Sequence, residues 1–202
     1  DAWPHMFYEG KLYNGHSQET VTAAGAEVLS VVNLREGILT RGVLVDMPVK
    51  LDVPWLPRDY AVSAADLDRF EAWSGVRIRA GDAVLVRTGR WAERAAEGPW
   101  APMQNGMAGV HPDVAAWLHA RDVAVIGSDA AMDALPSRVE GYGFPFHQLA
   151  LVSMGMPILD SLDLEDASAT AQQLHQRTFL LSVAPLPVEG ATGSPVNPIA
   201  TF

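Results

Sequence analysis

Histidines and carboxylates are the residues of this chain that could hold a metal ion, because it contains no cysteine. Asp1 and His5 are four residues apart, so on a helix or tight turn both side chains project to one side. A carboxylate and an imidazole placed in this way can share a cation or a proton. The alternative is an acidic residue and a solvated histidine with no common role, since the pattern D-x-x-x-H is frequent by chance. The spacing alone leaves both interpretations open.

His147 and Asp160 form a second candidate pair. His147 lies in the apolar stretch 145–151, where an imidazole needs a hydrogen-bond partner, so it is either a satisfied core histidine or a ligand. Asp160 follows a predicted strand at 157–159, and α/β folds place their sites at strand ends. A helix, a stop at Gly155 and that strand separate the two residues, and such a return of the chain would bring their side chains within reach.

The other four histidines are weaker candidates. His119 and His175 lie late in predicted helices and are expected at the surface. His111 directly precedes Pro112 and is expected to help start a helix, whereas His16 follows a loop.

Two further acidic residues have alternative interpretations. Asp129 follows a predicted strand, where it is either a site residue or a helix cap, and Glu140 lies in a loop before His147. The chain has neither the Gly-Lys-Ser/Thr of a P-loop nor the Gly-x-Ser-x-Gly of serine hydrolases. A metal-activated water is therefore the best remaining route to enzymatic chemistry.

Strands and helices alternate in the segments that must position these residues. Short apolar runs predict strands at 42–47, 83–88, 123–127, 157–159 and 178–184. Four helices are predicted: one after a capping box at 63–66, one that starts at Pro112, one over 146–154 and one that starts at Asp163. The alternation predicts an α/β fold with a mixed sheet and flanking helices.

The helix after the capping box has the clearest boundaries. Ser63 and Asp66 form the box, and Gly75 is expected to stop the helix. Leu67, Phe70 and Trp73 are expected to share one face of this helix.

Composition bounds the class of protein. The length of 202 residues fits one domain, and 49% hydrophobic with 19% charged residues argues against disorder. Fourteen basic against 24 acidic residues give a net charge of -10, which disfavours nucleic acid and anionic membranes as partners. The longest apolar stretch, 149–159, is shorter than the ~20 residues of a membrane span. The lack of cysteine and of a signal-peptide pattern favours the cytoplasm.

A set of short segments, in order along nearly the whole chain, carries a family resemblance. These segments are residues 1–8, 11–15, 37–38, 41–46, 86–91, 126–129, 147–151, 155–160 and 192–198. Together they resemble the metal-dependent cyclase family, which includes bacterial kynurenine formamidases, isatin hydrolase and trans-dienelactone hydrolase. The resemblance implies the family's swivelling β/β/α fold and assembly into homodimers or homotetramers.

The family signature H-x-G-T-H-x-D-x-x-x-H is matched only in its second half, by Asp1 and His5. Its two leading histidines would lie six and two residues before Asp1. The resemblance implies that longer members carry about a hundred residues ahead of this point, and the size of such a longer chain is consistent with that of large single domains. Residues 1–202 are therefore expected to form a single domain that corresponds to the C-terminal two thirds of such an enzyme.

The resemblance also implies roles for four residues. Asp1 would be a ligand able to bridge two metal ions, and His5 would be a second-metal ligand or the general acid/base. His147 would match the family's later metal-site histidine. Asp160 stands where formamidases have Glu and isatin hydrolase has Gln, so it is a candidate ligand with a shorter arm.

The implied function is a metal-dependent hydrolase that uses Zn²⁺ or Mn²⁺ to activate water and cleaves an amide, lactone or ester bond. Its substrate would be a small, ring-bearing molecule, and His5 or a carboxylate would relay the proton. Five aromatic residues are candidate pocket walls or ordinary core residues: Trp3, Phe7, Tyr8, Phe144 and Phe146. Two alternatives stay open: a catalytically incomplete fragment or binding module, and a metal-free cyclase or isomerase.

Overall fold

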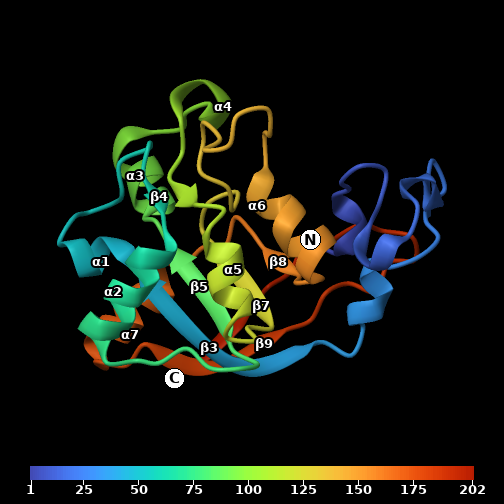
Figure 1. Ribbon diagram of the computed structural model, residues 1–202. Helices are drawn as coiled ribbons and strands as arrows, with labels where there is room; N and C mark the ends of the chain where they lie inside the picture. The colour runs from blue at the N-terminus through green and yellow to red at the C-terminus, as the bar shows by residue number, and fades with distance from the viewer.

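The computed structural model describes residues 1–202 and is built around one mixed sheet (Figure 1). Its six strands lie in the order β10 (Ile199–Thr201), β9 (Thr178–Val183), β3 (Ile38–Asp46), β5 (Ala83–Arg87), β7 (Val125–Ser128) and β8 (Ile158–Leu159). Strands β3, β5, β7 and β8 pair in parallel, whereas β9 pairs antiparallel with both β3 and β10. The prediction of an α/β fold with a mixed sheet is confirmed.

Seven α-helices connect and cover these strands. They are α1 (Met47–Leu51), α2 (Ala64–Ser74), α3 (Arg90–Glu97), α4 (Pro102–Asn105), α5 (Val114–His119), α6 (Pro145–His147) and α7 (Glu165–Gln173). Two small sheets pair β1 (Val21–Thr22) with β2 (Gly25–Ala26) and β4 (Ala61–Val62) with β6 (Gly109–Val110). None of the helices combines the length and the apolar character that a membrane span requires.

Helix α2 follows its predicted boundaries. The Ser63 hydroxyl accepts a hydrogen bond from the Asp66 N–H, the Asp66 carboxylate accepts one from the Ser63 N–H, and Gly75 closes the helix at φ 71°. Trp73 lies 5.8 Å from Phe70 between ring centroids, but the residue is 45% exposed. The Arg177 guanidinium lies 4.4 Å from the centre of the Trp73 ring, so a cation–π contact covers one of its faces.

Alternation along the strands produces a core on each face of the sheet. In β3, Val43 and Val45 belong to the larger core with α1, α2, α5 and α6, whereas Leu44 belongs to the smaller core with β9 and α7. Strand β8 divides in the same way between Ile158 and Leu159. Burial on both faces explains why these strands are apolar without interruption.

The helix before Gly155 and the last strand of the sheet differ from the predictions. The helix expected at 146–154 is a short α6 that continues as a π-helix, η5 (Gln148–Met154), before Gly155 ends it at φ 65°. A side chain at position 155 would meet the Tyr13 ring at 2.4 Å, so packing requires glycine there as well. Strand β10 was not predicted, because its pattern is too short to be recognised without its pairing to β9.

The first residues of the chain lie beside the C-terminal loop at one end of the molecule (Figure 1). Three backbone hydrogen bonds join the two segments: Ala2 N–H to Thr192 O, Ala26 N–H to Gly190 O and Val31 N–H to Ala191 O. The Ile158 N–H donates to Asp1 O, so Asp1 lies between β8 and this loop.

Candidate metal centre

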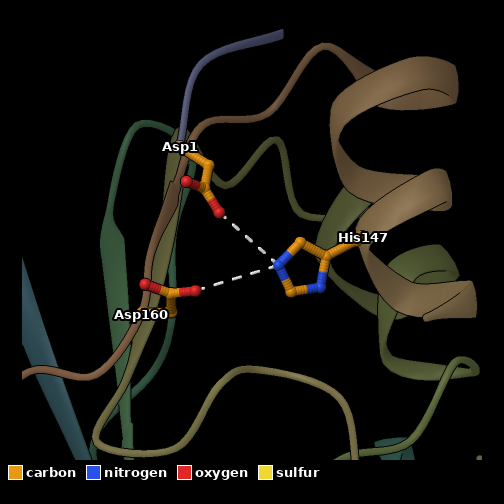
Figure 2. Close-up of side chains that lie close together, drawn as sticks. All are labelled: Asp1, His147 and Asp160. Atoms are coloured by element: carbon orange, nitrogen blue, oxygen red, sulfur yellow. Dashed lines mark ion pairs between the residues drawn. The ribbon is translucent and has the colours of Figure 1, made fainter. Parts of the chain in front are cut away.

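Asp1, His147 and Asp160 lie together although 159 positions separate the first from the last (Figure 2). The His147 Nε2 atom is 3.6 Å from Asp1 Oδ2 and 3.9 Å from Asp160 Oδ2. One ligand atom from each residue lies within 4.8 Å of the other two. The structure therefore brings together three of the four residues singled out in the sequence as one set.

Each side chain is positioned by a different element. His147 ends α6 and is buried, and Asp160 directly follows β8. Gly193 lies against Asp1, where an added Cβ would be 3.2 Å from Asp1 Oδ1. The strand end, the helix and the C-terminal loop thus meet at one point.

His147 has a different partner on each ring nitrogen. Its Nδ1 is 2.6 Å from Asp133 Oδ2 in the core, whereas its Nε2 faces the two carboxylates of the centre. Nδ1 therefore fits the interpretation of His147 as a satisfied core histidine, and Nε2 fits its interpretation as a candidate ligand.

His5 lies at the edge of the set, with Nε2 3.6 Å from Asp1 Oδ2 and a ring centroid 6.3 Å from that of His147. Its side chain is 44% exposed, and it is outside the group of three ligands. Partial burial lowers the pKa of His5, and the neighbouring His147 lowers it further. A neutral His5 can accept a proton near neutral pH.

The donor set fits a divalent cation. Two carboxylates and one imidazole suit Zn²⁺ and Mn²⁺, and metal bonds of about 2 Å place neighbouring donor atoms roughly 3 to 3.5 Å apart. The distances of 3.6 and 3.9 Å are slightly wider, which small side-chain rotations close. No lysine or arginine forms an ion pair with Asp1 or Asp160; the charge of Arg90 acts on Asp160 only from beyond ion-pair distance.

A cavity of about 500 Å³ adjoins the centre on the face of the sheet opposite α6. Asp1 and Asp160 contribute polar groups to it, and just over half of its lining residues are apolar. Among its apolar lining residues are Val31, Leu85, Phe179 and Val196. The candidate centre is therefore bordered by space for an apolar group.

The predicted aromatic walls separate into different environments. Phe146 is fully buried in the core, so its interpretation as a pocket wall is wrong. Phe144 lies edge-on to His147 with ring centroids 5.9 Å apart, and the Trp3 indole N–H donates to Gly155 O. Phe7 and Tyr8 are exposed.

The remaining candidates lie outside the centre. His16, His119, His175 and Glu140 are exposed. His111 Nδ1 lies 2.9 Å from Asp113 Oδ1 at the start of α5, as expected for a residue that helps to begin a helix.

Asp129 is a helix cap, and the helix that it caps is α3. Its buried carboxylate accepts the backbone N–H groups of Thr88, Gly89 and Arg90 and the Thr88 hydroxyl. Asp129 therefore does not begin a helix of its own, and its carboxylate instead accepts N–H groups at the start of α3, a helix earlier in the chain.

Comparison with known proteins places the chain in a family. The model of the family described as "Putative cyclase" matches residues 2–133, which is more than half of the chain. This chain belongs to the Cyclase family. A crystal structure of a novel cyclase is similar to it, with 31% identity and a TM-score of 0.88 over 100% of this chain. A search of the curated proteins gives no match.

Isatin hydrolases are among the other solved structures that resemble this Cyclase-family chain. One, bound to the product analogue thioisatinate, is 25% identical with a TM-score of 0.65 over 98% of this chain. Isatin hydrolase A from Labrenzia aggregata, 22% identical with a TM-score of 0.68 over 91% of this chain, shares the fold. The chain spans 67%, 68% and 70% of these three relatives, which is about two thirds of their length.

Asp133, which contacts His147 beside the candidate metal centre, was not identified from the sequence of this Cyclase-family chain. No motif marks it, since it lies fourteen positions before its partner in an irregular segment. The requirement that a buried imidazole has a hydrogen-bond partner predicted that such a residue exists without showing which one it is.

Proposed function

We propose that this Cyclase-family protein is a metal-dependent hydrolase that cleaves an amide, lactone or ester bond in a small, ring-bearing substrate. The observation that carries the proposal is the convergence of Asp1, His147 and Asp160 without a lysine or arginine in an ion pair with them. Similarity to an isatin hydrolase at 25% identity supports the reaction class.

Asp1 Oδ2, His147 Nε2 and Asp160 Oδ2 would hold the cation, Zn²⁺ or Mn²⁺. When bound, a divalent cation polarises a carbonyl group and lowers the pKa of water to about 7. His147 is held rigidly in the core, whereas Asp160 is partly exposed and can adjust its distance.

His5 would move the proton. Its Nε2 lies 3.6 Å from Asp1 Oδ2, beside the group of ligands and open to solvent. With its lowered pKa, the neutral ring accepts a proton as water attacks the carbonyl carbon, and the imidazolium then returns it to the leaving nitrogen or oxygen. Asp1 holds the imidazolium in place between these two steps.

The adjoining cavity supports the proposed class of substrate. A volume of about 500 Å³ with apolar residues in just over half of its lining has the size of a pocket for a small organic molecule. Asp1 and Asp160 line this cavity whereas His5 and His147 do not, so a ring bound there would approach the centre from the side of the two carboxylates.

The test combines metal binding with activity. Chelator-treated protein is titrated with Mn²⁺ and Zn²⁺, and its hydrolysis of aromatic formamides, lactones and esters is followed with and without metal. His147→Ala should lose both metal binding and turnover, whereas His119→Ala, which changes an exposed histidine, should retain both. Because three donors make up the group, we expect binding weaker than that of a four-ligand structural zinc site.

Two results would contradict the proposal. Activity that survives the chelator would favour a metal-free cyclase or isomerase. Absence of metal binding and activity in this chain, with both restored when upstream histidines of the family signature are supplied, would favour an incomplete module.

A further inference from the structure

A second carboxylate, Asp133, lies behind His147 and is almost completely buried, with 1% of its surface exposed. It accepts two backbone N–H groups of the next helix and contacts one ring nitrogen of His147. Oδ1 accepts the Phe146 backbone N–H at 2.7 Å, and Oδ2 lies 3.2 Å from the His147 backbone N and 2.6 Å from its Nδ1.

No arginine or lysine pairs with Asp133, whose ion-pair partner is His147 alone. A buried carboxylate is costly unless hydrogen bonds compensate it. The buried carboxylate of Asp129 is likewise held without an arginine or lysine ion pair, by three backbone N–H groups and the Thr88 hydroxyl. The short contact to the His147 ring is the feature that distinguishes Asp133.

We propose that Asp133 is the positioning residue of the candidate metal centre: it holds His147 as the Nδ1–H tautomer with Nε2 aimed at Asp1 and Asp160. An ionised carboxylate can only accept, so Nδ1 of the neutral ring must donate and Nε2 keeps its lone pair. A carboxylate behind a ligating imidazole also fixes the ring's orientation and raises its basicity. This inference rests on the proposed metal-dependent function.

The backbone around Asp133 is tightly held. The Asp133 N–H donates to Ala131 O, and the residue forms a bridge with Val110 of β6. Gly109 packs so closely that an added Cβ would lie 2.5 Å from the carbonyl oxygen of Asp133. Gly109→Ala therefore displaces Asp133 without changing any charge.

The first measurement is the tautomer of His147 in the metal-free protein at alkaline pH. Two-bond ¹H–¹⁵N correlation spectra separate the two ring nitrogens, and loss of the signals in His147→Ala assigns them. We expect the Nδ1–H form in the wild type.

Asp133→Asn should change this tautomer. The asparagine amide has one oxygen and one NH₂ group, so one of the two positions that accept N–H groups in the wild type must be taken by NH₂. If the NH₂ group faces His147, the amide oxygen keeps the short hydrogen bond from the Phe146 N–H. That NH₂ group then donates to Nδ1, which leaves Nε2 protonated and aimed at Asp1 and Asp160. The Mn²⁺ affinity should fall roughly 10- to 100-fold, the usual effect of losing such a partner.

Asp66→Asn is the matched control. Asp66 is also buried, and its carboxylate also accepts a backbone N–H at the start of a helix, but α2 does not carry a residue of the centre. Asp66→Asn should lower the melting temperature yet leave the His147 tautomer and the Mn²⁺ affinity unchanged. Gly109→Ala should weaken Mn²⁺ binding in the same direction as Asp133→Asn.

An Nε2–H tautomer in the wild type overturns the inference, and so does wild-type Mn²⁺ affinity in Asp133→Asn. If Asp133→Asn does not fold, the wild-type tautomer and Gly109→Ala decide the question. Failure of the wild type to bind Mn²⁺ would instead overturn the proposed function, and the tautomer of the metal-free protein would still show whether Asp133 orients His147.

Discussion

Two clusters of charged residues lie along the edge where the parallel strands end, and they are balanced in opposite ways. The arginine cluster consists of Asp46, Arg87 and Glu165, at the ends of β3 and β5 and the start of α7. The candidate metal centre consists of Asp1, His147 and Asp160, beside β8.

The arginine cluster supplies its own cation. Arg87 donates to Asp46 at 2.9 Å and forms a two-bond contact with Glu165 at 2.7 and 3.1 Å. The Ser168 hydroxyl donates to the remaining Asp46 oxygen. Burial alone would lower the pKa of Arg87, but the hydrogen bonds and charges of Glu165 and Asp46 raise it above its usual value.

The candidate metal centre has two carboxylates and an imidazole but no arginine or lysine paired with them. Burial of charge is therefore common to both clusters and does not distinguish a binding site from a structural network. The presence or absence of a built-in cation distinguishes them, and the following predictions test that difference.

The largest effect is expected from His5→Ala, which alters the chemistry beside the candidate metal centre. Turnover should fall roughly 10²- to 10⁴-fold, the usual contribution of a general acid/base, while Mn²⁺ binding and folding are retained. Steady-state kinetics at saturating metal measure it. An unchanged rate at full metal loading would show that His5 does not handle the proton.

Arg87→Met should break the arginine cluster and leave the metal centre intact. Removing the cation leaves Asp46 and Glu165 without their partner, so the free energy of unfolding should fall by about 3–5 kcal/mol in urea denaturation. Mn²⁺ affinity should not change. Arg35→Met, which removes an exposed ion pair with Glu36, is the control and should cost less than about 1 kcal/mol.

Adding metal should stabilise only proteins with an intact candidate metal centre. At a hundredfold excess over Kd, Mn²⁺ should add about 2.7 kcal/mol to the free energy of unfolding. The melting temperature should rise by about 5–10 °C in the wild type and by the same amount in Arg87→Met. His147→Ala should show no rise, and a rise equal to that of the wild type would exclude His147 as a ligand.

An Asp→Asn substitution should change the free energy of unfolding of the metal-free protein in opposite directions in the two clusters. Asp160→Asn removes one of two facing carboxylates and should stabilise the metal-free protein by up to about 1 kcal/mol. Asp46→Asn weakens a bond to Arg87 and should destabilise it by about 1–3 kcal/mol. Chemical denaturation after chelator treatment compares them, and equal signs would contradict the difference between the clusters.

The smallest effect concerns Asp66, a carboxylate whose partners Tyr60, Ser63 and Arg69 all lie within six positions of it in the chain. Although burial raises the pKa of Asp66, hydrogen bonds from Ser63 and Arg69 outweigh it and lower the pKa below its usual value. Its stabilising contribution is therefore present above the unfolded pKa of about 3.9 and is lost as the pH falls through the folded pKa. Asp66→Asn should cost about 1 kcal/mol at pH 7 and progressively less in acid, as measured by denaturation at several pH values.

Local patterns in the sequence were sufficient wherever neighbouring residues decide the structure. The Ser63–Asp66 box and Gly75 define α2 because their hydrogen bonds join residues only a few positions apart. The strands at the centre of the sheet were recognisable because burial on both faces demands uninterrupted apolar runs. The same reasoning placed Asp160 at a strand end and gave His147 a need for a partner.

Contacts between distant segments decided the rest. Strand β10 exists through its register with β9, and Phe146 is a core residue because α6 turns it toward the sheet. Asp133 meets His147 because residues 133–135 lie alongside residues 107–110, a pairing that no spacing in the sequence records. Asp1 reaches Asp160 because its backbone pairs with Ile158. Such contacts depend on sheet register and packing, which are set by the whole fold, whereas helix caps and alternating strands are set by residues that are neighbours in the chain.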